Sequence, residues 1–256
     1  MSLNFARAFI IACGAITATS VCAESGSAGV QLEAGASREI LDKGYANWSS
    51  HYIEGEKKLD EREVVHAQLR KTERFNRQDD EITASYTRPL NEQWSLQLEG
   101  TSSPTHLILP KYAFLGQVQY AWTDGWSVYG GMRHTEYTAS SVNVGVLTAE
   151  RYAGDYRFAY SLYTAWLAGA EAVNSHRVQA TRFYSDKSWV GLSLSGGQEL
   201  ENLGGGLVQK SDVQSLVFNG RHWLDADWAL SYEMLLHQQG TYYTRQGFRV
   251  GLRRQF

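Results

Sequence analysis

Cysteine and proline are scarce in this sequence, and each scarcity narrows the class of protein. The two cysteines, Cys13 and Cys22, both fall within the first 23 residues. The rest of the chain therefore has no disulfide framework and no cysteine-ligated metal site, and it can cross an oxidising compartment without mispairing. Only three prolines occur in 256 residues, which suits a protein of long β-strands, because proline cannot donate to a sheet.

Long apolar runs and an excess of positive charge are also absent. After Ala23 no apolar run approaches 18 residues, so membrane-spanning helices are excluded. Removal of the first 23 residues would take away Arg7 and no acid, so the formal charge would go from −3 to about −4, which is no signature of nucleic-acid binding. The mean hydropathy is negative, yet a transmembrane barrel tolerates this because only alternate residues of each strand meet lipid.

The first 23 residues are predicted to be a cleaved secretory signal peptide. A basic residue, Arg7, precedes an apolar stretch over residues 9–16, and the small-residue sequence VCA ends at Ala23. We expect cleavage after Ala23. Residues 24–29 then form a short polar lead, and residues 30–256 form the predicted folded domain.

From Val30 onward, segments of about ten residues alternate between apolar and polar side chains. The last segment reads YTRQGFRVGLRRQF, and it places Phe248, Val250 and Leu252 on one face and arginines on the other. Successive side chains of a strand point to opposite sides, so lipid outside and a wet lumen inside would satisfy both faces. Fourteen such segments predict an all-β protein, a closed antiparallel up-and-down transmembrane β-barrel. The tenth and twelfth segments are the least regular, so twelve strands is the alternative.

A soluble β-sandwich or lipocalin-like barrel is the competing fold. It would turn the apolar faces inward, around one shared core. It would then have to arrange many strands that carry Trp, Tyr and Leu around that single core, which disfavours it.

The connections between segments alternate between short and long, which is typical of the periplasmic turns and external loops of an outer-membrane barrel. The short connections are predicted at 89–93, 123–125, 153–155, 185–188 and 225–227. The long connections are predicted at 38–44, 102–111, 168–175 and 196–212. Asp124-Gly125 is a strong hairpin dipeptide, and the three glycines at 204–206 are interpreted as a flexible loop tip.

Aromatic residues flank the short connections, and we interpret them as a girdle at the lipid–water interface. The predicted girdle residues are Trp94, Trp122, Trp126, Tyr152, Tyr156, Tyr184 and Trp228. Trp189 and Trp223 also flank these turns, but their positions in the alternation place them on the opposite face. The simpler alternative explanation is that aromatic residues are common in β-strands in general.

Charged residues on the inward face are the candidate functional residues. The candidates are Glu33, Arg70, Glu99, Arg133, Arg157, Arg177, Glu233, Arg245, Arg249 and Arg253. One hypothesis is a constriction that selects anionic or hydroxylated cargo. The other is a salt-bridge network that fills the barrel, because an unpaired buried charge is costly. Fourteen strands lie between the filled eight-stranded barrels and the open sixteen-stranded ones, so both hypotheses stay open.

Catalytic, metal and cofactor sites find little support in the sequence. Ser49, Ser50 and His51, together with His134 or His176, are the candidates for a lipid-modifying enzyme, but no nucleophile elbow accompanies them. Alternation in this segment places Trp48 and Tyr52 on the lipid face and His51 on the lumen face. The seven histidines are scattered without metal-ligand spacing. We therefore predict no catalytic residues, no metal site, no cofactor and no enzymatic activity.

The sequence GMRHTEY, which begins at Gly131, resembles a motif of the YaiO-type outer-membrane β-barrel family. The residues that carry the resemblance are Gly131, Arg133, Thr135 and Tyr137, and the likeness extends loosely over residues 30–256. The resemblance implies a location in the bacterial outer membrane. It implies no settled activity, but by analogy it suggests export of a polysaccharide.

The terminal Phe256 resembles the assembly signal of bacterial outer-membrane barrels, although Arg254 stands where that signal usually has an apolar residue. The implied partners are outer-membrane lipid and the barrel assembly machinery, with an exopolysaccharide or another polar solute as cargo and no nucleic acid. The predicted function is passage or export of a polar solute such as a saccharide. The alternatives are a structural or assembly barrel with a filled lumen and, less favoured, a lipid-modifying enzyme.

Overall fold

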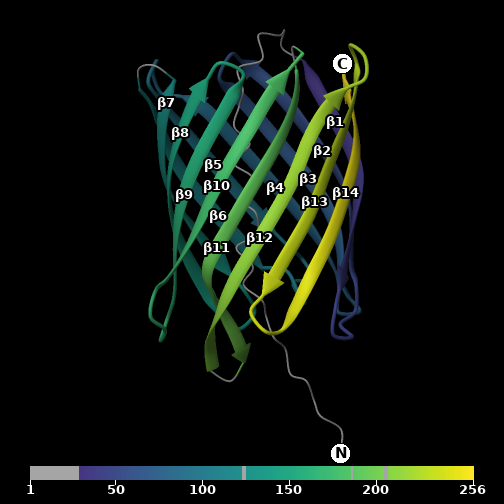
Figure 1. Ribbon diagram of the computed structural model, residues 1–256, viewed down its shortest axis with the longest axis vertical. Coiled ribbons are helices and arrows are strands. Elements are labelled where there is room, and N and C mark those ends of the chain that lie inside the picture. Colours follow the sequence, from purple (N-terminus) through teal and green to yellow (C-terminus); the bar gives the residue numbers. More distant parts are fainter. Residues whose placement is uncertain (1–28, 123–124, 186, 205–206) are drawn as a thin grey trace, which may run out of the picture.

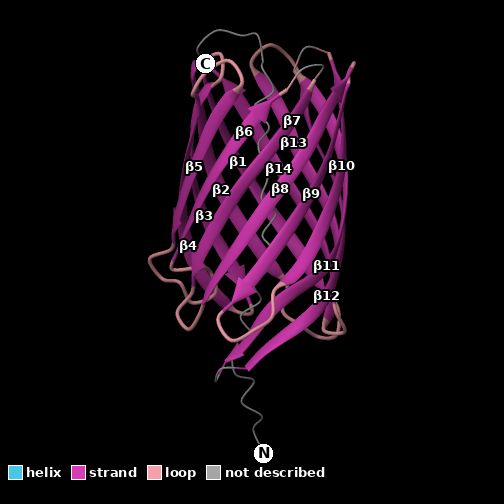
Figure 2. Cartoon of the chain, turned by 90° about the vertical axis from the view of Figure 1, so that its left-hand side faces the viewer, coloured by secondary structure: helices cyan, strands magenta, loops and turns pink. Residues whose placement is uncertain are grey.

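The chain folds into a closed barrel of fourteen antiparallel strands, seen in a computed structural model that describes residues 29–122, 125–185, 187–204 and 207–256 (Figures 1 and 2). The strands are β1 (Val30–Leu41), β2 (Trp48–Asp60), β3 (Glu63–Arg74), β4 (Arg77–Pro89), β5 (Trp94–Ser102), β6 (Tyr112–Ala121), β7 (Trp126–Glu136), β8 (Ser141–Ala153), β9 (Tyr156–Leu167), β10 (Val173–Tyr184), β11 (Ser188–Gly204), β12 (Leu207–Trp223), β13 (Trp228–Gln239) and β14 (Tyr243–Gln255). The predicted fold class and strand number are confirmed. The predicted cleavage at Ala23, together with residues 24–28, Asp124 and the glycines at 205–206, lies outside the described residues.

Pairing between β1 and β14 closes the sheet. Their antiparallel register runs from Gln31 opposite Gln255 to Leu41 opposite Arg245. Because every strand thereby gains two neighbours, no sheet edge presents unpaired backbone groups to hydrocarbon. Among the described residues, no helix is long and apolar enough to cross a membrane.

The alternation in β14 divides its side chains between the two surfaces as the sequence predicts. Phe248 and Leu252 are 49% and 47% exposed on the outer surface, whereas Gly251 and Arg253 are buried on the inner one. The apolar side chains therefore point outward toward lipid and the arginines point inward. This arrangement excludes the soluble alternative, in which the apolar face would form the core.

The two ends of the barrel differ in the length of their connections. The end that holds the C-terminus has turns of two to four residues, such as 154–155 between β8 and β9. The opposite end has connections of up to nine residues, at 103–111 between β5 and β6. We assign the first as the periplasmic end and the second as the extracellular end, because outer-membrane barrels have short periplasmic turns.

The extracellular connection 103–111 is held in place by Asp79 on β4. The Asp79 carboxylate accepts hydrogen bonds from the backbone N–H groups of Leu107 at 3.0 Å, Ile108 at 2.6 Å and Leu109 at 2.8 Å. Ser103 also donates from its hydroxyl to the backbone oxygen of Asp80 at 2.7 Å. A charge-assisted cluster of this kind orders the loop against the barrel.

The prediction of a long loop at 196–212 is wrong, because most of these residues continue β11 and β12. Pairing extends from Gly197 opposite Val213 to Gly204 opposite Leu207, and the hairpin reaches beyond its neighbours at the extracellular end (Figure 2). Its glycines and polar residues suggested a loop, but backbone hydrogen bonds between strands do not require apolar side chains. The predicted loop at 38–44 is shorter for the same reason, since β1 continues to Leu41.

The predicted orientation of residues 48–52 is also wrong. Trp48 and Tyr52 are 2% and 5% exposed and point inward, while His51 is exposed on the outer surface. The Tyr52 ring lies over Gly35 of β1 and Gly251 of β14, where a Cβ atom would overlap it. The two glycines thus make room for an aromatic side chain inside the wall, which the polarity of the segment alone did not indicate.

Six of the seven predicted girdle residues lie on the outer side of the barrel, whereas the prediction is wrong for Tyr152. Trp94, Trp126, Tyr156 and Trp228 lie on the outer surface near the periplasmic turns, as does Tyr184, and Trp122 is 65% exposed in a turn. Tyr152 points inward, because it pairs in register with the buried Arg157, and its ring stacks on Phe183 at 6.3 Å. Trp189 and Trp223 also point inward, and Lys187 lies 4.8 Å from the Trp223 ring.

Substitution of Gly251 by alanine should destabilise the barrel, because the new methyl group would overlap the Tyr52 hydroxyl and the Glu33 carboxylate. Overpacking of this kind costs about 1–3 kcal/mol. The change would be measured as a lower midpoint for loss of the folded band on heat-modifiability gels. Gly100→Ala is the control, since nothing lies within 4 Å of a Cβ atom at Gly100. An equal midpoint in the two variants would contradict the close packing of Tyr52.

Candidate functional site in the barrel interior

Three arginines form a ladder along the inner face of β14. Arg245, Arg249 and Arg253 are spaced four residues apart, so they share one face of the strand. Arg245 lies at the extracellular end, Arg253 at the periplasmic end and Arg249 between them. Their acidic partners come from β1, which pairs with β14 in the closed barrel, and from β2, which lies on the far side of β1.

Arg253 is the most fully paired arginine of the ladder. Its guanidinium donates to Glu33 at 2.8 Å, to Glu54 at 2.7 Å and to Gln31 at 2.9 Å, and its side chain is 3% exposed. The Glu33 carboxylate also accepts from the Tyr52 hydroxyl at 2.6 Å. Buried charges are tolerated when such hydrogen bonds satisfy both partners. This cluster therefore joins β14, β1 and β2 into a rigid part of the wall.

Arg249 is held more loosely than its neighbours in the ladder. Its guanidinium lies 4.0 Å from the centre of the Tyr52 ring, 3.5 Å from a Glu54 oxygen and 3.9 Å from a Glu33 oxygen. The Arg249 side chain is 34% exposed, against 11% for Arg245. Of the three arginines, Arg249 is the one that a solute in the lumen would meet most readily.

Arg245 belongs to an aromatic cluster near the extracellular mouth. It pairs with Glu39 at 2.8 Å and lies 4.7 Å from the Trp48 ring, while Arg74 lies 4.5 Å from the same ring. Phe75 and Tyr243 meet the Trp48 ring edge-on, with centroids 5.3 Å and 6.0 Å away. Cation–π contacts with both arginines explain why this tryptophan lies inside the barrel instead of facing lipid.

The other predicted interior residues form smaller ion pairs around the wall. Arg70 pairs with Glu81 at 2.5 Å between adjacent strands. Arg133 on β7 reaches Glu99 on β5 at 2.5 Å, across Leu115 of the intervening β6, which is 1% exposed. The last of these pairs therefore shields an inward-facing leucine from the lumen.

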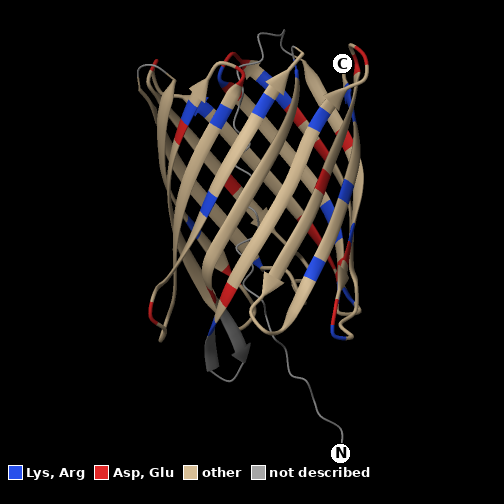
Figure 3. Ribbon diagram, in the orientation of Figure 1, with Lys and Arg blue, Asp and Glu red and all other residues tan. Residues whose placement is uncertain are grey.

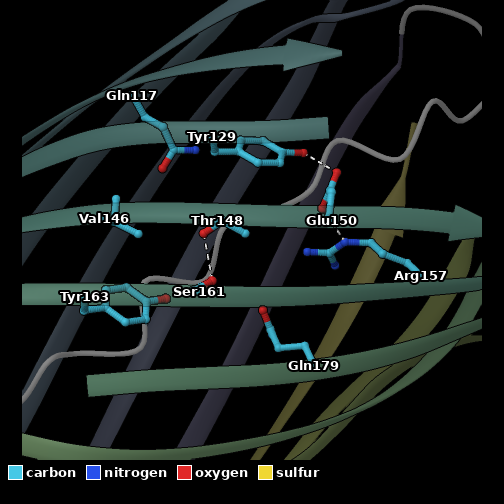
Figure 4. Close-up of a pocket in the computed structure, with 9 residues that line it drawn as sticks. All are labelled: Gln117, Tyr129, Val146, Thr148, Glu150, Arg157, Ser161, Tyr163 and Gln179. Atoms are coloured by element: carbon cyan, nitrogen blue, oxygen red, sulfur yellow. Dashed lines mark hydrogen bonds and ion pairs between the residues drawn. The ribbon is translucent and has the colours of Figure 1, made fainter. Parts of the chain in front are cut away.

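Arg157 and Glu150 form a further ion pair beside a small hollow in the wall (Figure 4). Their closest nitrogen and oxygen are 2.8 Å apart, and the Tyr129 hydroxyl also donates to Glu150. The hollow that these three residues line has a volume of about 20 Å³, which is enough for a water molecule and not for a solute. The pair is thus a structural element of the wall.

Arg177 and Glu233 also point inward, near the middle of the barrel. Arg177 lies 5.6 Å from the Tyr163 ring, and Glu233 is opposite Arg249 in the β13–β14 register. All ten predicted interior residues thus lie on the inner face, but the structure does not bring them together at a single constriction. They are distributed over the wall, with the largest cluster on β14, β1 and β2.

Several acidic partners were missed by reasoning from the sequence. Glu54 was missed because its segment, which includes Trp48 and Tyr52, was predicted with the opposite orientation. Glu39, Glu81 and Glu150 are the remaining partners. The signal that could have found them is cross-strand pairing, since an inward arginine needs an acid on a neighbouring strand at the same depth.

One side of the interior is apolar. Near the extracellular end, Val142, Val144, Ala165 and Val173 point inward from β8, β9 and β10 and form a buried cluster with Tyr163. The interior therefore has an ionic wall on β14, β1 and β2 and an apolar area at the extracellular end of β8 to β10, whereas the Glu150–Arg157 pair lies closer to the periplasmic end of the same strands. In the described part of the chain, no group of three or more His, Cys, Asp or Glu side chains is placed to hold a metal ion.

The closed barrel, its lipid-facing apolar surface and its ionic interior define an integral β-barrel protein of the bacterial outer membrane. The chain belongs to the YaiO family, because the model of the YaiO membrane beta barrel domain matches residues 30–201. The predicted family and location are confirmed. A search of curated proteins found no match.

Solved structures share the fold at low sequence identity. A bacterial polysaccharide outer membrane secretin superposes with a TM-score of 0.58 and 9% identity, covering 89% of this chain and 98% of that one. A loop-deletion mutant of OmpT, an outer membrane protein of Vibrio cholerae, gives 0.50 and 11%, covering 90% and 100%. Salmonella typhi OmpF in complex with daunomycin gives 0.50 and 9%, covering 89% and 97%. These likenesses establish the architecture.

The residues of the family motif share the inner face of the wall. Gly131 lies so close to β6 that a Cβ atom would come within 2.9 Å of the Gly116 backbone oxygen. Arg133 pairs with Glu99, Thr135 is buried, and Tyr137 belongs to the apolar cluster. The motif therefore fixes how β7 packs against the interior.

Replacement of Arg253 by alanine should cost far more stability than replacement of its neighbour Arg254. Loss of Arg253 leaves Glu33 and Glu54 without their main partner, and breaking a buried pair costs about 3–5 kcal/mol. Arg254 lies outside on the Trp228 and Phe256 rings, where a cation–π contact contributes about 0.5–1 kcal/mol. Urea unfolding in detergent would measure both, and similar losses would contradict the assigned cluster.

Proposed function

We propose that this barrel passes a polar solute, such as a saccharide, across the outer membrane. The observation that carries the proposal is the arginine ladder of β14 with its acidic partners. Arg245 and Arg253 are eight residues apart, which corresponds to about 27 Å along a strand. The ionic strip thus extends over most of the depth of the membrane, so a solute would find hydrogen-bonding groups along its path.

The positions of the ion pairs support an open path over a filled interior. Arg253 and Arg249 find their acids on β1 and β2, and Arg70 and Arg157 find theirs on the adjacent strand. These pairs lie along the wall and do not cross the lumen. Fourteen tilted strands about 4.8 Å apart give roughly 28 Å between opposite backbones, which leaves space between the side chains of facing walls.

The chemistry of the strip favours hydroxylated or anionic cargo. Guanidinium groups donate several hydrogen bonds in a fixed plane and suit carboxylate and hydroxyl oxygens. Arg249 is the most exposed member of the ladder, and it lies beside the Tyr52 ring and the Glu54 carboxylate. A sugar unit could exchange hydrogen bonds with these groups as it passes. The likeness to a polysaccharide secretin is one of fold, so the proposed cargo class rests on these side chains.

Removal of the Arg249 side chain should widen the path and lower its preference for anions. In planar bilayers, Arg249→Ala is expected to raise single-channel conductance and to increase the cation-to-anion permeability ratio severalfold, because the nearby carboxylates then dominate the local field. Arg254→Ala is the matched control, since that arginine faces lipid on the same strand. Unchanged conductance and selectivity in a folded Arg249→Ala barrel would count against the proposal.

Liposome swelling with neutral sugars and with a uronic acid separates passage from the structural alternative. Passage predicts swelling faster than in protein-free liposomes, with the uronic acid slowed by Arg249→Ala. A structural or assembly barrel is the second candidate function, and it is favoured by the buried apolar cluster of Val142, Val144 and Tyr163 on one inner wall. Folded wild-type protein that gives no swelling would support this second function.

A further inference from the structure

We infer that the outer surface of β7 to β10, near the periplasmic turns, is a binding site for one anionic glycerophospholipid. The site consists of two arginines, Arg151 and Arg182, and three aromatic residues, Trp126, Tyr156 and Phe158. It lies on the lipid-facing side of the wall and is independent of the lumen. The proposal does not depend on what the barrel transports.

Both arginines are placed by the strand register at the same depth as aromatic rings. Arg151 on β8 is opposite Trp126 on β7 and Phe158 on β9, and its guanidinium lies 5.3 Å from the Trp126 ring. Arg182 on β10 is opposite Tyr156 on β9, and its guanidinium lies 6.0 Å from that ring. The two arginines therefore flank β9 on the outer surface.

The surface between the arginines is apolar and aromatic. The Tyr156 and Phe158 rings stack with centroids 6.1 Å apart and planes 10° apart, and they are 44% and 49% exposed. Leu147 and Tyr160 continue this exposed surface toward the middle of the membrane. The aromatic floor and the apolar surface below it suit the glycerol backbone and acyl chains of a lipid.

The charge of the site identifies the headgroup. In the described part of the chain, no carboxylate is paired with either guanidinium. Strands two positions apart in a sheet are about 10 Å apart, so the long side chains of Arg151 and Arg182 can converge on one phosphate between them. Arginine binds phosphate bidentately, and basic residues at a membrane surface attract anionic lipid.

At the opposite end of the barrel, an outward cation is accompanied by an acidic residue. There the outward Lys71 is directly opposite Asp80 in the register, so a carboxylate offsets its charge. At the periplasmic end, Arg254 repeats the pairing of a guanidinium with outward aromatic rings, at 5.2 Å from Trp228, and Figure 3 shows basic residues on several strands near that end. The periplasmic leaflet of an outer membrane consists of glycerophospholipid, so the site faces the lipid that it would bind.

The test is competition between two lipids on the full barrel. Protein folded into mixed micelles with equal phosphatidylglycerol and phosphatidylcholine is analysed by native mass spectrometry, and the ratio of the two bound lipids is measured. Wild-type protein should enrich phosphatidylglycerol. In Arg151→Gln with Arg182→Gln the enrichment should fall by about fivefold for each arginine, and so by roughly 25-fold for both.

Two matched variants, and a second competition of phosphatidylglycerol with lipid A, complete the test. Arg38→Gln with Lys71→Gln removes two exposed outward cations at the extracellular end and should leave the enrichment unchanged. Arg151→Lys with Arg182→Lys keeps the charge and should retain most of it, and heat-modifiable migration on gels checks that each variant is folded. Equal binding of the two lipids by wild-type protein, the same enrichment in the glutamine variant, or a preference for lipid A over phosphatidylglycerol would each overturn the proposal.

Discussion

The fold depends on closure of the sheet between its first and last strands. Hydrocarbon offers no hydrogen-bond partner, so an unpaired edge strand in the membrane would leave a row of backbone groups unsatisfied. The β1–β14 register satisfies them. The same pairing brings Glu33 and Arg253, which are 220 residues apart in sequence, within 2.8 Å of each other. Closure and the ionic cluster are therefore two consequences of one contact, since the charges can be buried only where the sheet is complete.

The interior is divided into two kinds of wall, and this division shapes the functional hypotheses. On β14, β1 and β2, arginines and glutamates pair along the wall and leave Arg249 partly free. On β8 to β10, valines and Tyr163 form an apolar cluster. A charged wall opposite an apolar area suits the proposed solute, which has both hydroxyl groups and less polar faces. The same apolar area suits packing, and this is the basis of the structural alternative.

The outer surface is also asymmetric, but along the membrane normal. Near the periplasmic turns the outward positions combine arginine with exposed aromatic rings. Near the extracellular end, Lys71 and Asp80 face each other in the register and offset one another. Amphipathic rings and long cationic side chains both favour the membrane interface. The difference between the ends gives the barrel a chemical polarity that a uniform girdle would not have.

The sequence by itself predicted the closed barrel of fourteen strands, with twelve as the alternative, the outward faces of most segments and the inward position of the ten charged candidates. Period-two alternation carries this information because each strand meets lipid on one side only. The orientation predicted from the sequence is wrong for two aromatic side chains that neighbouring strands accommodate inside the barrel. Tyr52 lies inside because Gly35 and Gly251 on neighbouring strands leave room for its ring, and Tyr152 lies inside because it shares a register position with Arg157. The extended β11–β12 hairpin is a further exception, because its glycines and polar residues favour a loop although they pair as strands.

Only the tertiary structure decided which charges meet. Glu54, Glu150 and Tyr52 acquire their roles from cross-strand neighbours, and a register between strands distant in sequence cannot be read from local alternation. The proximity of the lipid-facing Arg151 and Arg182 cannot be predicted from local alternation for the same reason. These two residues are 31 positions apart in the sequence, but the barrel places them on either side of β9. Alternation fixes the face of each side chain, while closure of the barrel fixes its partners.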